Sequence, residues 1–224
     1  MSIEFENLLT LPPATETERA HIQSRLQTQA PPFVSDSDTM AVIAFGGTIQ
    51  SAYLPHLETI KPVAMNPTIE KILALADSFG IASLNITGTI LVAKDSRDIT
   101  KSDMGMLIHT ISEIKNAKIV VTCGTYMLPP ITRVLDHYFG NNKSEKIIGV
   151  TGSMLPLSQK EQDADLNIGG TLAAVEMLGH LNQKGCVFAQ FHGKIFTNED
   201  LKTLDLHTSA PSLRFLRSFV TYEK

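Results

Sequence analysis

The sequence predicts an α/β fold with a doubly wound, mostly parallel sheet flanked by helices. From Met40 onward, apolar strand-like runs alternate with segments whose apolar residues recur at helical spacing. The strand-like runs are continuous in Val and Ile, which is typical of strands buried on both faces. Such alternation favours parallel strands joined by helical crossovers.

The elements are expected in a regular order along the chain. Strands are expected over residues 40–45, 81–93, 118–122, 146–151 and 185–191, with a loop over residues 50–64. The first helix is expected to begin with Asn66 as N-cap and Pro67 at its first position, and to end at Gly80.

Three further helices follow from caps and spacing. Thr100 and Asp103 have the spacing of a capping box, and the buried stripe expected behind them is Met104, Leu107, Ile111 and Ile114. The next helix is expected to start near Pro129-Pro130 and to end at Gly140. The last, over residues 165–181, contains several small residues, which indicates close packing on the sheet.

Composition divides the chain into two parts and excludes several function classes. Residues 1–38, with two Pro-Pro pairs, are expected to be an N-terminal extension and linker, and residues 39–224 one α/β domain. A net charge of −4 and a pI near 6.0 give no electrostatic reason to expect a nucleic-acid or membrane partner. Cys123 and Cys186 form neither a disulfide framework nor a zinc pattern, and no metal or cofactor is expected. The acidic N-terminus is not a signal peptide, and the cytoplasm is the expected location.

Two strand-like runs end in glycine followed by threonine. Gly46-Gly47-Thr48 follows the first strand, and Gly124-Thr125 follows the third. The carboxyl ends of parallel strands share one edge of a sheet, where ligands bind. Two hydroxyls at this edge favour nucleophilic or acyl-transfer chemistry. The glycines lack the full fingerprint of a dinucleotide or phosphate loop, so phosphate binding is a minor alternative.

Four blocks appear together in one order. They are Gly46-Gly47-Thr48-Ile49, Asp95-Ser96-Arg97-Asp98-Ile99-Thr100, Thr122-Cys123-Gly124-Thr125 and Val150-Thr151-Gly152-Ser153-Met154-Leu155-Pro156, with Asp163 to Asn167 after the last. Over about residues 40–210 the chain closely resembles the bacterial-type L-asparaginase family, especially its cytoplasmic branch. The resemblance implies the Rossmann-like fold of that family's N-terminal domain.

The resemblance also implies an amidohydrolase that releases ammonia from a small amide such as L-asparagine. Thr48 would be the nucleophile, and Thr125 would be the second active-site threonine, helped by a lysine. Ser96 would bind the substrate carboxylate with Asp95 beside it. The turns at Gly47 and Gly124 would supply N–H donors to the developing oxyanion.

The lysine and a tyrosine are less firmly placed by the resemblance. Lys202 takes the lysine position if the preceding loop is one residue shorter than in the family; otherwise Thr203 falls there, and Lys202 is a surface residue. Tyr53 is the tyrosine in the loop after Thr48, where the family has one that assists the nucleophile, although it comes earlier than the family position.

The chain departs from the family at positions that set specificity. Tyr126 stands where the family has an aspartate that holds the substrate ammonium, and Met127 follows where threonine is usual. Arg97 stands beside Ser96 and would repel an ammonium if it points inward. The family's second domain, which lends an acidic residue to a neighbouring subunit, has no counterpart in these 224 residues.

Three hypotheses follow. The first is an amidohydrolase with the asparaginase mechanism, which acts weakly on asparagine or acts on another amide through Thr48, Ser96 and Thr125. The second is a non-catalytic binding module, with Tyr126 and Met127 forming an apolar surface. The third is an amide-processing subunit of a larger amidotransferase. A homodimer or higher homo-oligomer is expected in each case, because family sites lie near subunit contacts.

Overall fold

The computed structural model describes residues 39–54, 59–62, 67–78, 86–160 and 162–202, together with Glu16, Thr17 and Ala20. Strands and short 3₁₀ turns are β1 (Met40–Phe45), η1 (Thr48–Gln50), β2 (Ser51–Leu54), β3 (Thr59–Pro62), β4 (Ile86–Val92), η3 (Ser96–Asp98), β5 (Lys118–Cys123), η4 (Thr125–Met127), β6 (Ile147–Thr151), β7 (Cys186–Phe191) and β8 (Lys194–Phe196). The helices are α3 (Pro67–Ser78), α4 (Lys101–Glu113), α5 (Leu128–Phe139), α6 (Ala164–His180) and α7 (Asn198–Lys202).

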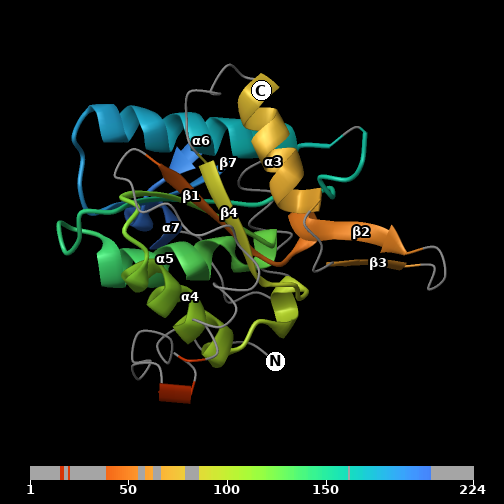
Figure 1. Ribbon diagram of the computed structural model, residues 1–224, viewed down its shortest axis with the longest axis horizontal. Coiled ribbons are helices and arrows are strands. Elements are labelled where there is room, and N and C mark those ends of the chain that lie inside the picture. Colours follow the sequence, from red (N-terminus) through yellow and green to blue (C-terminus); the bar gives the residue numbers. More distant parts are fainter. Residues whose placement is uncertain are drawn as a thin grey trace.

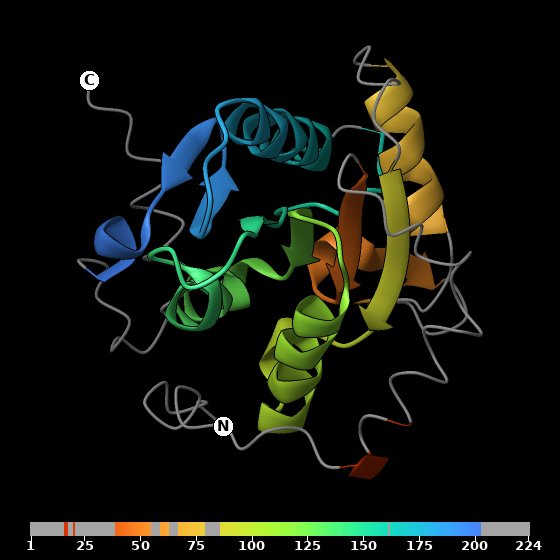
Figure 2. The same cartoon turned by 60° about the vertical axis from the view of Figure 1, so that its left-hand side comes forward.

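The main sheet has six strands in the order β4-β1-β5-β6-β7-β8. The first five strands of this order pair in parallel, and β8 pairs antiparallel with β7. Helices α3 and α6 cover one face, and α4 and α5 cover the other (Figures 1 and 2). The expected doubly wound α/β fold is therefore confirmed.

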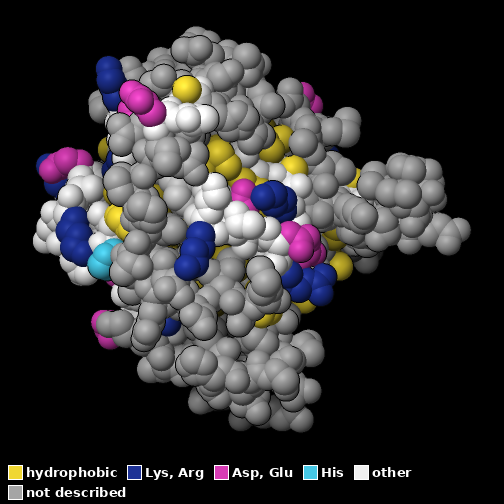
Figure 3. Space-filling view, turned by 90° about the horizontal axis from the view of Figure 1, so that it is seen from below, with side chains coloured by type: hydrophobic (Ala, Val, Ile, Leu, Met, Phe, Trp, Pro, Cys, Tyr) yellow, Lys and Arg dark blue, Asp and Glu magenta, His cyan; other side chains and the backbone are white. Residues whose placement is uncertain are grey.

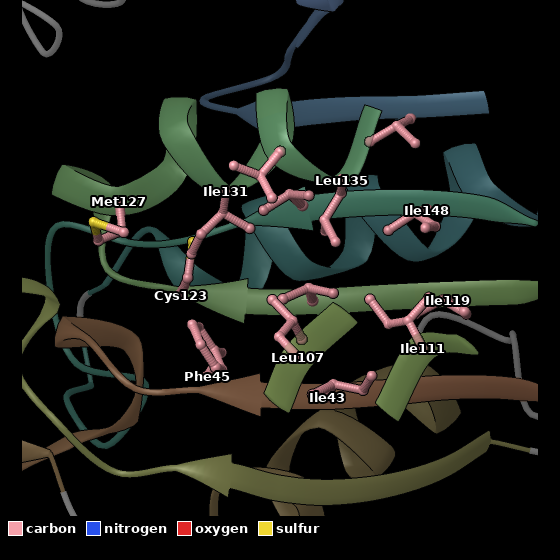
Figure 4. Close-up of a cluster of buried hydrophobic side chains, with 14 of the residues drawn as sticks. Ile43, Phe45, Leu107, Ile111, Ile119, Cys123, Met127, Ile131, Leu135 and Ile148 are labelled. Atoms are coloured by element: carbon pink, nitrogen blue, oxygen red, sulfur yellow. The ribbon is translucent and has the colours of Figure 1, made fainter. Parts of the chain in front are cut away.

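Each face of the sheet has its own hydrophobic core. Alternate residues of β1 divide between them: Ile43 and Phe45 pack toward α4 and α5, while Met40 and Val42 pack toward α3 and α6. Figure 4 shows the first core, where side chains of α4 and α5 meet those of β1, β5 and β6. Because both faces are covered, the strands are apolar throughout, which explains their continuous Val and Ile runs.

The helix starts predicted from capping residues are found in α4 and α3. Thr100 and Asp103 form a reciprocal capping box at the start of α4, and the expected stripe on that helix is buried. Pro67 is the first residue of α3, whereas Asn66 and Gly80 lie outside the described residues. Of the strand expected over 81–93, the structure describes residues 86–92 as β4.

Two features differ from the sequence-based expectations. The loop expected over residues 50–64 contains an antiparallel hairpin, β2 with β3, which projects to one side of the molecule in Figure 1. The strand β8 was also not expected; it turns back along β7 after His192 and Gly193, which both have positive φ. The short length of these strands explains why their patterns gave no signal.

No helix in the described part of the chain has the length and apolar character to cross a bilayer. On the face shown in Figure 3, described basic and acidic side chains lie interspersed. Except for Glu16, Thr17 and Ala20, the extension expected over residues 1–38 lies outside the described residues, so its boundary stays a prediction.

Candidate active site

The order of the strands places a topological switch point at β1. The chain leaves β1 for β4 on one side, and then crosses through α4 to β5 on the other side. In open α/β sheets, the crevice at the carboxyl ends of strands flanking such a point is the usual ligand site. Thr48, Ser96 and Thr125 each open a 3₁₀ turn within a few residues of the end of β1, β4 and β5, respectively.

The three turns that carry Thr48, Ser96 and Thr125 lie in close contact with one another. A Cβ atom added to Gly47 would collide with the backbone of Gly124, and one added to Gly124 would collide with the Ser96 side chain. Gly47 also has a φ of 81°, which L side chains rarely adopt. Glycine is therefore required at both positions for the turns that carry Thr48 and Thr125 to approach each other.

None of the three hydroxyl groups has a hydrogen-bond partner among the described residues. Thr48, Ser96 and Thr125 are each only partly exposed. Most polar groups in protein interiors are paired, so partly buried and unpaired hydroxyls that share one sheet edge are available to a ligand. The structure thus brings together the three hydroxyls that the sequence singled out.

The N–H groups of the two glycines in the first turn are already in use. The Gly46 N–H donates to Oε1 of Gln50 at 3.0 Å, and the Gly47 N–H donates to the Lys94 carbonyl at 2.9 Å. Gly47 therefore holds the turn in place and is not free to bind an oxyanion. Of the two glycine turns expected to bind one, the turn at Gly124 and Thr125 remains the candidate.

Asp95 and Arg97 form an ion pair at the rim of the site. The Arg97 Nε donates to Oδ1 of Asp95 at 3.0 Å, and a second guanidinium nitrogen lies 3.4 Å from Oδ2. The hydrogen bond from the Arg97 side chain holds the pKa of Asp95 below its usual range, against the opposing effect of burial. The Arg97 side chain is 75% exposed, so it lies at the surface of the site and not inside it.

Tyr126 and Met127 differ in their surroundings. Tyr126 is partly buried, packs against the core beneath α4 and α5, and lies within electrostatic reach of Arg97. Met127 is only 3% exposed and belongs to that core. The expected apolar surface of Tyr126 with Met127 is therefore wrong for Met127, because this side chain is needed for packing.

Two cysteines also have different surroundings. Cys123 is fully buried, and burial strongly raises the pKa of its thiol, so it has no thiolate character at neutral pH. Cys186 is only half-buried. Cys123 therefore positions the second turn through packing and not through chemistry.

For Lys202 and Tyr53 the structure describes the backbone but not the side chain. Lys202 ends α7, which packs on α5 through the buried Leu201 and through a 2.7 Å hydrogen bond from Asn198 to Asp136. Tyr53 lies in β2 opposite Ile60. Thr203 lies outside the described residues. The roles of Lys202 and Tyr53 in the site therefore stay predictions.

Lys94 and Gln50 are two supporting residues that the sequence reasoning missed. The Lys94 carbonyl receives the Gly47 N–H, while its Nζ forms an ion pair with Asp103 at 2.8 Å. The side chain of Gln50 is buried and fixes Gly46. The sequence held one signal for each residue: Lys94 directly precedes Asp95, and Gln50 lies two residues after Thr48.

A second polar cluster lies at the ends of β6 and β7. Asp163, just before α6, accepts hydrogen bonds from the N–H groups of Met154 and Leu155 and from Nδ2 of Asn167, and its Oδ2 lies 3.0 Å from Nε2 of His192. The Asn167 side chain also donates to the Gly152 carbonyl at 2.9 Å. Asp163 thereby anchors the loop after β6, whose Gly152 packs against Cys123 and the Thr125 N–H.

Comparisons with known proteins identify the family and agree with the fold. The family model described as "Asparaginase, N-terminal" matches residues 39–210. No curated protein sequence matches the chain.

Among solved structures, the thermostable L-asparaginase from Thermococcus kodakarensis aligns with a TM-score of 0.55 and 22% identity over 71% of this chain and 46% of its own. A probable cytoplasmic L-asparaginase from Campylobacter jejuni aligns with a TM-score of 0.59 and 17% identity, over 72% of this chain and 48% of its own. L-asparaginase I from Vibrio cholerae aligns with a TM-score of 0.54 and 18% identity, over 73% of this chain and 47% of its own. The chain thus aligns with about half the length of each of these proteins, and at these identities the likeness shows the fold.

Proposed function

Because the match over residues 39–210 shows that the chain belongs to the asparaginase family, we propose that it is an amidohydrolase with a threonine nucleophile. Its substrate is the amide group of L-asparagine or a related small molecule, and its products are the acid and ammonia. The observation that carries the proposal is that three hydroxyls, those of Thr48, Ser96 and Thr125, lie at the switch point without a hydrogen-bond partner among the residues that the structure describes.

In the proposed reaction, Oγ1 of Thr48 attacks the amide carbon and transfers its proton to a base. The tetrahedral intermediate collapses when the nitrogen takes a proton and leaves as ammonia, which leaves an ester on Thr48. Water then attacks the ester and releases the acid and the free hydroxyl. No external oxidant or cofactor is needed for these steps.

Thr125 and Lys202 are the groups we assign to proton transfer, with Ser96 as a ligand of the substrate carboxylate. A threonine hydroxyl is a weak nucleophile until a neighbouring base removes its proton. The direct contact between the Gly47 and Gly124 backbones supports this assignment, because it keeps the two threonine-bearing turns together. Backbone N–H donors for the oxyanion are assigned to the turn at Gly124.

The test is ammonia release from L-asparagine, L-glutamine and uncharged small amides by the wild-type protein, Thr48→Ala and Thr125→Val. We expect each substitution to lower kcat by about 10³-fold or more, as in enzymes that lose a nucleophile or its activating group. Neither hydroxyl has a hydrogen-bond partner in the described part of the chain, so folding should be unchanged in circular dichroism.

A matched control is Thr132→Val, which changes a buried threonine of α5 whose hydroxyl donates to the Leu128 carbonyl within its own helix. This variant should keep its ammonia release. Equal activity in wild type and Thr48→Ala, with any amide, would contradict the proposal.

The alternative is a binding module without catalysis, and Tyr126 supports it because a partly buried tyrosine replaces an acid next to Thr125. A folded wild-type protein that binds an amide or acid in calorimetry but releases no ammonia would favour this alternative.

We also propose that the protein acts in the cytoplasm as a homodimer or larger homo-oligomer. The support for the location is the solved structure from Campylobacter jejuni, which is described as a probable cytoplasmic L-asparaginase. The support for the assembly is the resemblance to a family whose sites lie near subunit contacts. Light scattering coupled to gel filtration would test the assembly, and a monomer at micromolar concentration would contradict it.

A further inference from the structure

We propose that the site formed by Thr48, Ser96 and Thr125 selects a small amide that carries no α-ammonium group. The proposal rests on the amidohydrolase function above and narrows its substrate class. It follows from the charges that the described residues place around the three hydroxyls.

A bound ammonium needs a carboxylate to replace the water that it loses. Each partly buried carboxylate described near this edge already has partners. Asp95 is paired with Arg97, and Asp103 with Lys94. Asp163 receives two backbone N–H groups and the side chain of Asn167, and it contacts His192. Asp98 is exposed and lies within electrostatic reach of Arg97.

The position of Arg97 in the chain favours a lasting ion pair with Asp95. The two residues are separated by only one position in the same 3₁₀ turn, and Asp95 also accepts the backbone N–H of Arg97 at 3.0 Å. A ligand ammonium would therefore compete with a tethered guanidinium that makes two contacts with the same carboxylate.

Tyr126, next to Thr125, offers a bound ammonium no negative charge to replace its lost hydration. It directly follows Thr125 and lies within electrostatic reach of Arg97. A phenol is uncharged at neutral pH and offers a weaker acceptor than a carboxylate. An α-ammonium at this edge would find the Asp95 carboxylate already paired with Arg97 and a neutral ring beside Thr125, whereas a substrate that lacks the ammonium needs neither group.

Succinamate and L-asparagine are the matched pair for the test, because they differ only in the α-ammonium group. We expect kcat/KM for succinamate to exceed that for asparagine by about tenfold or more, the usual effect of one charge-assisted contact. A preference for asparagine in the wild type would overturn the proposal.

Two variants test the assigned cause. Tyr126→Asp adds a carboxylate, and Arg97→Ser removes an exposed guanidinium and leaves Asp95 unpaired, so both should shift the ratio toward asparagine by about tenfold. Arg97→Ser changes a side chain that is 75% exposed, and should therefore fold even if Tyr126→Asp does not. The control is Lys184→Ser, which removes another exposed, ion-paired cation at the far end of β7 and should leave the ratio unchanged.

Binding of succinate and L-aspartate, measured by calorimetry, separates this proposal from the amidohydrolase function. Tighter binding of succinate without ammonia release would support the selectivity and contradict the catalysis. Ammonia release with tighter binding of aspartate would support the catalysis and overturn the selectivity. Binding of neither ligand would also overturn the selectivity.

Discussion

At the carboxyl edge of the sheet, the ends of β1, β4 and β5 carry hydroxyls without partners, whereas the ends of β6 and β7 carry a carboxylate with several. Thr48, Ser96 and Thr125 make no hydrogen bonds within the described part of the chain. Asp163, by contrast, is bound by backbone and side-chain donors that hold one loop. The two regions share one edge, so the difference separates groups kept available for a ligand from groups used for folding.

A pair of glycine substitutions tests this comparison most strongly. Gly47→Ala places a Cβ against the Gly124 backbone at a positive φ, and we expect a loss of about 3 kcal/mol or more in the free energy of unfolding. Gly193→Ala, near the second region, also has a positive φ but meets open space, and should cost about 1 kcal/mol. Urea denaturation measures both. Equal losses would show that the contact between the turns is not tight.

Removing Asp163 should have the next largest effect. Asp163→Ala leaves the exposed N–H donors of Met154 and Leu155 and the partly buried side chain of Asn167 without this acceptor, and we expect a loss of about 1–2 kcal/mol in the free energy of unfolding. Thr48→Ala removes no hydrogen bond, and should change stability by less than about 1 kcal/mol. Thermal and urea unfolding of both variants would check this, and a larger loss for Thr48→Ala would contradict the division between the regions.

The smallest expected effect concerns Asp95. Its folded pKa is lowered by Arg97, so its contribution to stability is present above the unfolded value, about 3.9, and is lost as pH falls through the folded value. The pair is exposed to solvent, so we expect less than about 0.5 kcal/mol. Arg97→Ser should flatten the stability curve slightly between pH 4 and pH 2, as measured by urea unfolding at each pH. An unchanged slope would show that the pair is not formed in solution.

The sequence predicted the elements that depend on local patterns. The continuous apolar runs of β1 and β5 indicated strands buried on both faces, and Thr100 with Asp103 marked the start of α4. The hairpin over β2 and β3 was missed because its strands are four residues each and lack a clear alternation. The positions of Thr48 and Thr125 followed from strands that end in glycine.

The details of the site depend on contacts that no sequence pattern contains. The pairing of Arg97 with Asp95 is set by the side-chain conformation of a short turn. The engagement of Gly47 with the Lys94 carbonyl depends on how two distant segments approach each other. The burial of Met127 depends on the direction in which α5 leaves the second turn.

The contact between Gly47 and Gly124 has a consequence for how this protein can change over evolution. The separation of the two threonine-bearing turns is set by main-chain atoms, so a neighbouring partly exposed side chain such as Tyr126 can be replaced without altering it. New substrate preferences can therefore arise by single substitutions around a fixed frame. The same contact makes the two glycines interdependent, because enlarging either one displaces the other.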